Sequence, residues 1–479
     1  MRLVLMFSAM SVRFLLFMLG VSVFATVPAH AQIVELPPDP ASTKVTLPPL
    51  DRDRVIAMSD DVDAPVIHLT LPEVVARVQS ENLRVLLNRE AVEQALQDTY
   101  VQRSRLLPRV GLEVSQQRNR FVNVGRGFGG GAGGTPTTQN RSDAAIVASM
   151  SVFDLQRIAD FRLAKLGYEI SELSYQTFLQ DIVTEVAAAY YTHLRNIRRL
   201  EVSDANIERD KVLLDLAESQ FQAGTATRLD VTRAEVQLAG DMLARLQQET
   251  EVVLSAMRLK RLLDLDLDAI LVLEDPNADG LPDPHHLDFS LRQILMQRPE
   301  YRRAEVELSR ERLERDKADW ERVPTVSVFG EYGYASTEII DSNQQNQWGI
   351  GVALSMPIFE GFRIRANRLR ADSSIRAQEY VVRDLENQIG AEYRVVIEDI
   401  QSRFKQIAVS QKRVELSQEE LSLALRRFEE GVAGNREVVD AQTALATSED
   451  DLVESIFLYS LSRVEWARVI GDINRLARE

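Results

Sequence analysis

The sequence has 479 residues, a formal net charge of -16 and no cysteine. The acidic balance argues against a nucleic-acid partner and against a polybasic membrane anchor. Without cysteine the chain has no acceptor for an N-terminal lipid, so we expect that it is not a lipoprotein, and its stability must come from packing rather than from disulfides.

Residues 1–31 have the pattern of a secretory signal peptide. Arg2 and Arg13 precede an apolar run at 14–19, and the stretch Ala29-His30-Ala31 follows it. A charged region, a short apolar region and a small-x-small cleavage site are typical of such signals. We therefore predict export, with an extended N-terminal segment over residues 32–68 of the exported chain.

Two pairs of segments alternate apolar and polar residues with a period of two. The predicted strands are 109–118 and 143–152 in the first half of the chain, and 325–335 and 347–356 in the second. About ten residues suits a tilted strand that crosses a bilayer with one apolar and one polar face. Tyr332, Tyr334 and Trp348 would then lie where a membrane-interface aromatic girdle belongs. For any single strand, a half-buried sheet in a soluble domain remains an equal alternative.

Four strands are too few for a closed barrel, which needs about eight or more. Because open sheet edges cannot face lipid, the chain would complete its barrel with copies of itself, giving about eight strands in a dimer or twelve in a trimer. An eight-stranded barrel is filled by its own side chains, so a conducting pore favours the trimer. The polar, Gly-rich loops at about 119–142 and 336–346 should face the outside of the cell. A phosphate-binding loop at the glycines of 127–134 is disfavoured, because no Lys-Ser/Thr follows them.

Two stretches lack proline, between Pro136 and Pro276 and after Pro357, so both are free to form very long helices. Each carries a seven-residue apolar repeat, which indicates coiled-coil-like packing. The repeat positions are Val186, His193, Leu200, Ile207, Leu214 and Phe221 in the first stretch, with His193 as the one polar member, and Tyr393, Ile400, Ile407, Val414, Leu421 and Phe428 in the second. We predict helical hairpins over about 154–266 and 360–471, whose first helices would each be about 100 Å long.

A motif at the end of each long helix occurs twice. The pattern Phe-x-x-Gly, five further residues, Asp/Glu-Val-x-x-Ala-Glu/Gln-x-x-Leu covers 221–238 and recurs at 428–445. The glycines suggest left-handed helix ends, so we predict hairpin tips at 224–230 and 431–437. We infer a tandem duplication with repeat 1 over 69–268, a spacer over 269–286, repeat 2 over 287–472 and a C-terminal tail over 473–479.

The order of these elements resembles the TolC-like outer-membrane efflux family over about 69–471, most specifically in the two tip motifs and in Met-Pro-Ile-Phe-Glu-Gly at 356–361. The resemblance implies a mainly α fold with membrane β structure: a trimer forming a twelve-stranded β-barrel, continued by an α-helical tunnel across the periplasm. It implies residence in the outer membrane of a Gram-negative bacterium, in contact with its lipid. The implied function is the passive exit duct of a tripartite efflux pump or type I secretion system, with a periplasmic adaptor and an inner-membrane transporter as partners.

The resemblance also implies site residues. Glu437 and Asp440 match an acidic pair that rings the periplasmic constriction, whereas the residues taken without the resemblance favour ordinary solvated first-turn acids, which the helix dipole stabilises. Ala433 stands where the family commonly carries an arginine, with Arg436 nearby. The expected adaptor-contacting tips are Gly224, Thr225, Ala226, Thr227, Arg228, Leu229 and Asp230, with Gly431, Val432, Ala433, Gly434, Asn435 and Arg436.

No catalytic grouping or metal-ligand cluster occurs at interpretable spacing, so we expect no enzyme, no cofactor and no metal. His285 and His286 adjoin an Asp- and Pro-rich spacer, but nothing else with ligand spacing is near. The alternative function is a soluble periplasmic coiled-coil adaptor or scaffold, although this chain carries two hairpins in tandem. The sequence does not identify the cargo, since drug, metal and polypeptide exporters share this kind of duct.

Overall fold

The computed structural model describes residues 65–122, 136–277, 280–282, 289–337, 345–473 and 475. The predicted signal peptide, most of the predicted N-terminal segment, parts of both predicted external loops, and His285 and His286 lie outside the described residues. Within the described ranges, no helix is both long and apolar enough to cross a membrane.

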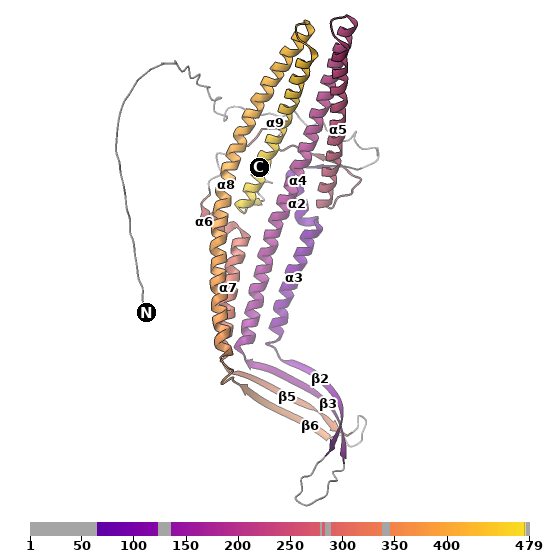
Figure 1. Ribbon diagram of the computed structural model, residues 1–479. Coiled ribbons are helices and arrows are strands. Elements are labelled where there is room, and N and C mark those ends of the chain that lie inside the picture. Colours follow the sequence, from indigo (N-terminus) through magenta and orange to yellow (C-terminus); the bar gives the residue numbers. More distant parts are fainter. Residues whose placement is uncertain are drawn as a thin grey trace, which may run out of the picture. The chain divides into compact units, whose positions relative to one another are not determined.

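The described elements occur twice in the same order (Figure 1). The first half comprises β1 (Val66–Leu69), α2 (Leu71–Glu81), α3 (Leu83–Ser104), β2 (Arg109–Val122), β3 (Pro136–Phe153), α4 (Leu155–Gln222) and α5 (Arg228–Leu262). The second comprises β4 (Ile270–Leu273), α6 (Leu291–Gln297), α7 (Pro299–Trp320), β5 (Thr325–Ser336), β6 (Gln345–Ser355), α8 (Arg363–Glu429) and α9 (Asn435–Val469). This order confirms the predicted tandem duplication.

Strands β1 and β4 form a small parallel sheet that the sequence did not predict. Val66 pairs with Ile270 and Leu69 with Leu273. One strand lies at the end of the expected N-terminal segment and the other inside the expected spacer. With four residues each, both strands are too short to give a recognisable alternation.

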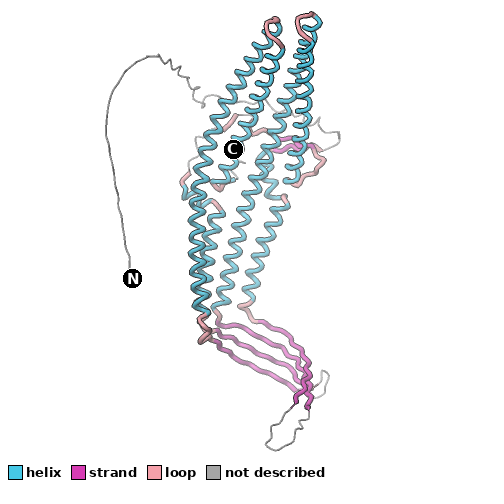
Figure 2. Tube along the Cα trace, viewed as in Figure 1, coloured by secondary structure: helices cyan, strands magenta, loops and turns pink. Residues whose placement is uncertain are grey.

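The other four strands form one antiparallel sheet in the order β2-β3-β5-β6 (Figure 2). The pairing places most of the apolar residues of the four strands on one face, because the side chains of paired residues share a face. Across the sheet, Leu112 pairs with Ile146, Ile146 with Tyr332, and Tyr332 with Trp348. β3 begins at Pro136, whereas the alternation of apolar and polar residues predicted a start at 143. The additional residues are polar, and they continue the pairing with β2.

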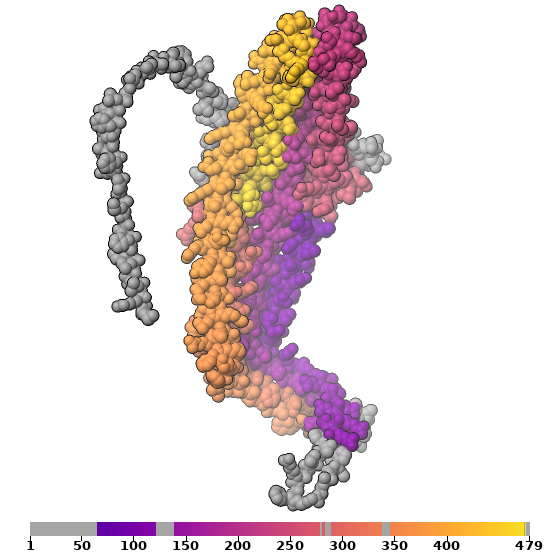
Figure 3. All heavy atoms as spheres, viewed as in Figure 1, coloured from indigo at the N-terminus to yellow at the C-terminus, as the bar shows by residue number. Residues whose placement is uncertain are grey.

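A side-chain cap sets the start of α4, and two left-handed residues set the start of α8. The Asp154 carboxylate caps α4 by accepting from the backbone N–H groups of Gln156 and Arg157. α8 begins at Arg363, three residues later than predicted, because Gly361 and Phe362 have left-handed φ values of 59° and 66°. In the space-filling view, α8 runs beside α7 toward the sheet and beside α9 toward the tips (Figure 3).

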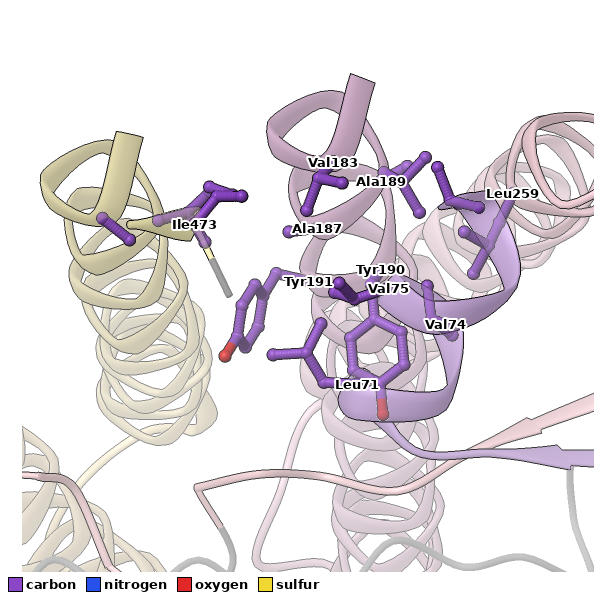
Figure 4. Packing of buried hydrophobic residues seen from close by; sticks show 14 of the residues in the cluster. Leu71, Val74, Val75, Val183, Ala187, Ala189, Tyr190, Tyr191, Leu259 and Ile473 are labelled. Atoms are coloured by element: carbon purple, nitrogen blue, oxygen red, sulfur yellow. The ribbon is translucent and has the colours of Figure 1, made fainter. Parts of the chain in front are cut away.

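The main core lies around the middle of α4, where the small sheet, α2 and the ends of α5 and α9 meet. Figure 4 shows part of it, including Val74, Tyr190 and Leu259, none of which is exposed. The Tyr190 hydroxyl donates to the backbone oxygens of Glu274 and Leu69, and so connects α4 to β1 and to the residue that follows β4. Ile473, assigned to a tail by the sequence, packs into this core.

The predicted heptad positions point inward along most of both long helices. Ile400, Ile407 and Phe428 are buried in α8, whereas Phe221 at the end of α4 is 43% exposed. His193, the polar member, is buried, and its Nδ1 lies 2.9 Å from the Ser255 hydroxyl. Burial, with the charge of Lys260 as a second cause, lowers the pKa of His193 to about 4, so it packs as a neutral side chain.

Candidate functional site: the two helical tips

The two hairpin tips have the same backbone. Gly224 and Gly431 are left-handed, with φ values of 77° and 71°. The Gly224 N–H donates to Phe221 O at 3.1 Å and the Thr225 N–H to Gln220 O at 2.9 Å. In the second tip, the Gly431 N–H donates to Phe428 O at 3.0 Å and the Val432 N–H to Arg427 O at 2.9 Å. This is the Schellman arrangement, and the left-handed residue that it requires accounts for both glycines.

The first tip uses its acidic residue to cap a helix. Thr227 is the N-cap of α5, and its N–H and hydroxyl both donate to Asp230 Oδ2, at 2.9 and 2.6 Å. The Thr227 hydroxyl bond is the main cause that lowers the pKa of Asp230. The Asp230 carboxylate is therefore held within its own tip.

In the second tip, the acidic residues pair with arginines instead of capping a helix. Gly434 is the N-cap of α9 and has no side chain to cap it. Glu437, which corresponds to Asp230, lies 3.4 Å from the Arg427 guanidinium, and Asp440 lies 3.6 Å from that of Arg436. All four side chains are exposed, and exposed ion pairs of this kind are weak. Both carboxylates are thus on the first turns of α9, within reach of solvent and ions.

Two side chains join the tips. The Asn435 amide donates to the backbone oxygen of Asp230 at 2.7 Å, and the Gln220 amide donates to that of Phe428 at 3.0 Å. Asn435 is fully buried. The Phe428 carbonyl lies in the last turn of α8, where carbonyls need partners outside the helix.

Beneath the tips, a small apolar core holds the four helices together. It contains residues of both hairpins, which are Leu213, Ala217, Val231, Ala234, Leu421, Ala424, Phe428, Val438, Ala441 and Leu445. The repeated Val and Ala of the tip motif are therefore core residues. The polar residues between them are free to form the surface.

Further from the tips, ion pairs connect α4 to α9. The Arg209 guanidinium lies 2.6 Å from Glu449, and that of Arg199 lies 2.7 Å from Asp450. Sequence reasoning missed these pairs, and it missed the roles of Asn435 and Gln220. A heptad pattern shows which face is apolar, but it does not show which charged residues of two helices meet.

The remaining predicted site residues lie at two places. Leu229 and Val432 expose apolar side chains at the tips. Tyr332, Tyr334 and Trp348 are exposed on the apolar face of the four-stranded sheet, toward the strand ends that lie away from the helices. Among the described residues, no three His, Asp or Glu side chains are grouped so that they could hold a metal ion.

A duplicated unit of strand hairpin and long helical hairpin, with a sheet that exposes apolar residues on one face and tips that carry acidic residues, is the arrangement of an outer-membrane channel class of protein. The chain belongs to the outer membrane efflux protein family, whose model matches residues 75–264 and 290–456. Membership favours the channel over the adaptor alternative.

Similarities to individual proteins agree with this family assignment. The chain is similar to nodulation protein T of Rhizobium leguminosarum bv. trifolii, with 23% identity in an alignment over 318 residues that covers 64% of each chain. It is similar to outer membrane protein TolC of Escherichia coli (strain K12), with 21% identity over 400 residues, covering 78% of this chain and 76% of that one. Its fold is that of the CmeC outer membrane channel of Campylobacter jejuni, with a TM-score of 0.71 at 17% identity over 90% of both chains.

Proposed function

We propose that the protein is the passive exit duct of an efflux or secretion system, formed by three copies of the chain in the outer membrane of a Gram-negative bacterium. The three four-stranded sheets would form one twelve-stranded barrel, and the helices would continue it as a tunnel through the periplasm. A periplasmic adaptor would bind the tips, and an inner-membrane transporter would supply the energy. Family membership supports this role over that of an enzyme.

The observation that carries the proposal is the sheet. Its one apolar face is exposed on all four strands, for example at Leu112, Ile146, Tyr332 and Ile350. Within the described part of the chain, β2 and β6 are its outer strands. A sheet with a lipid-facing surface must close on itself, so β6 of one copy would pair with β2 of the next. Exposed Ile358, Phe359 and Phe362 at the junction of β6 and α8 would lie at the inner membrane surface.

Two exposed rows on the helices support closure by copies of the same chain. Residues 229, 236, 243, 250 and 257 of α5 are Leu, Val, Leu, Thr and Met, and residues 395, 402, 409, 416 and 423 of α8 are Val, Ser, Val, Leu and Leu. The apolar members of both rows are exposed. The rows have the same spacing and the same length, and both end near a tip. Such matched heptad rows fit antiparallel packing of α5 on α8 of a neighbouring copy.

Native mass measurement in detergent tests the assembly and should give a trimer. Leu243→Glu on the α5 row should weaken it, because a charge would be buried in the new interface. Ala244→Glu introduces the same charge at an exposed position about 100° around the same helix, so it is the matched control and should leave the trimer intact. A stable monomer that inserts into membranes would overturn the proposal.

The acidic pair gives the functional test. In a trimer, Glu437 and Asp440 would place six carboxylates around a narrow neck, which attracts cations and repels anions. Single-channel recording in planar bilayers should show lower cation selectivity and weaker block by multivalent cations after Glu437→Ala with Asp440→Ala. Asp230→Ala is the matched control, because that carboxylate is held in its own cap. Unchanged selectivity in the double variant would refute the constriction and favour the solvated first-turn reading.

A further inference from the structure

The polar face of the four-stranded sheet carries an unexpected aromatic side chain, Phe329 of β5. Its neighbours two residues away on the same face are Ser327 and Glu331. Its partners across the strands are Ser149 of β3 and Gly351 of β6. Phe329 is 49% exposed, so one side of the ring is open to solvent while the other is covered.

The covered side of the ring lies over Gly351. A Cβ added at Gly351 would lie 2.5 Å from Cζ of Phe329 and 2.9 Å from its Cε2, well inside van der Waals contact. The ring therefore occupies the space that any other residue at 351 would fill. This crowding is particular to Gly351, because two residues away on the same face a Cβ at Gly349 would lie 3.4 Å from the Glu331 side chain, an ordinary contact distance. The Gln347 amide donates to Glu331 Oε1 at 3.1 Å and holds it in place.

We propose that Gly351 keeps the barrel part of the duct wide, because its missing side chain lets the Phe329 ring lie flat against the wall. The inference rests on the proposed function, in which the polar face lines the lumen. Three copies would place three rings at one level of the barrel. Any side chain at 351 would force each ring to stand away from the wall and narrow the passage for large cargo.

The Phe329 ring could not lie instead against β3, the strand on the other side of β5. Ser149, the partner on β3, already has a Cβ and a hydroxyl at the corresponding position. A ring displaced from Gly351 would therefore move toward the open lumen. The width at this level depends on a pair of residues, so removing the ring should cancel the effect of filling the glycine position.

The chain contains no cysteine, so a single introduced thiol reports on one position. Ser355→Cys lies on the polar face of β6, four residues or about 13 Å beyond Gly351 toward the helices. Gln345→Cys lies at the other end of β6, before the rings. Maleimide-linked polymers of graded size are added to intact cells, and the largest polymer that labels each thiol is recorded.

In the Ser355→Cys protein, Gly351→Val should lower the largest polymer size that labels, while a small maleimide still reacts. Phe329→Ala alone should leave this size unchanged, because the ring already lies against the wall. Phe329→Ala together with Gly351→Val should restore it. Gly330→Ala, on the apolar face, is the matched control and should have no effect.

The outcomes separate the two proposals. Labelling at Gln345→Cys by all sizes in every variant shows that the barrel is assembled and open to the outside. Failure of the small maleimide to reach either thiol would contradict the proposed function. An unchanged size limit in the Gly351→Val protein, or no restoration in the double variant, would overturn the inference about Phe329 while leaving the duct intact.

Discussion

Thr227 and Gly434 occupy the same place in the two tips, as the N-caps of α5 and α9. The threonine binds Asp230, whereas the glycine leaves Glu437 to pair loosely with Arg427. One residue at a helix start thus decides whether the acid three positions later stabilises its own tip or remains accessible to ions. Duplicated units can therefore keep one backbone and still use the equivalent acid differently, as a cap in one copy and as an exposed carboxylate in the other.

The comparison extends to the packing below the tips. Phe221 and Phe428 are equivalent in the repeat, but Phe221 is half-exposed and Phe428 is 2% exposed within the shared core. Asp210 and Asp241 of the first hairpin correspond to Ser417 and Ser448 of the second. The first hairpin therefore places two carboxyl groups where the second has two small hydroxyls.

The largest effect should come from the phenylalanines. Phe428→Ala should lower the local opening free energy of the second tip by about 3–5 kcal/mol, because it leaves a cavity in a packed core. Phe221→Ala should cost no more than about 1 kcal/mol, because the Phe221 side chain is already 43% exposed and its removal takes away less buried apolar area. Hydrogen-exchange mass spectrometry of the four tip helices measures both. Equal costs would show that the two tips are packed alike in the assembled protein.

The buried Asp210 should give the next largest effect, and one that depends on pH. Burial, followed by the hydrogen bond and the charge of Asp241, raises the pKa of Asp210 to about 8. Below about pH 4 the group is protonated in both the folded and unfolded states. As the pH rises toward 8, the unfolded state gains stability by ionising while the folded group stays neutral, so folding weakens.

Asp210→Asn removes this penalty while keeping the shape of the side chain. We expect it to stabilise the first hairpin by on the order of 2 kcal/mol at pH 7.5 and by little near pH 4. Hydrogen exchange in α4 and α5 at several pH values, corrected for intrinsic exchange, measures the gain. Ser417→Asn in the second hairpin is the matched control and should give no pH-dependent gain. A gain at Asp210 that is independent of pH would contradict the raised pKa.

Exchanging the N-caps should give the smallest effect and tests the comparison directly. Thr227→Ala should cost about 1 kcal/mol at the start of α5. Gly434→Thr should add a few tenths to about 1 kcal/mol at the start of α9. The backbone of Gly434, with φ -84° and ψ 160°, is already that of an N-cap residue and accepts a side chain.

The Gly434→Thr protein should also turn Glu437 toward the cap and away from Arg427. Cation selectivity in planar bilayers should then fall part of the way toward that of the Glu437→Ala, Asp440→Ala protein. If Gly434→Thr protects the start of α9 but leaves cation selectivity unchanged, capping does not withdraw the Glu437 carboxylate from the neck.

Local patterns in the sequence were enough for much of the fold. Alternation with period two found all four strands of the large sheet, because its apolar face is continuous. The seven-residue repeat of α8 and the absence of proline found the long helices. The glycines at 224 and 431 predicted the tips, because few residues other than glycine adopt the left-handed conformation at a helix end. These features depend on neighbours in the chain and leave a periodic trace.

Only the tertiary structure decided which distant residues meet. The Asn435 bond to Asp230, the ion pairs of Arg199 and Arg209 with α9, and the β1–β4 pairing each join residues far apart in the sequence. Gly351 gave no signal of its own until the register placed Phe329 over it. Equivalent acids at 230 and 437 look alike in the sequence, and their partners differ because a side chain three residues earlier is present in one copy and missing in the other. Periodicity specifies the face that a side chain occupies, whereas its partner depends on register and on the shape of the opposing surface.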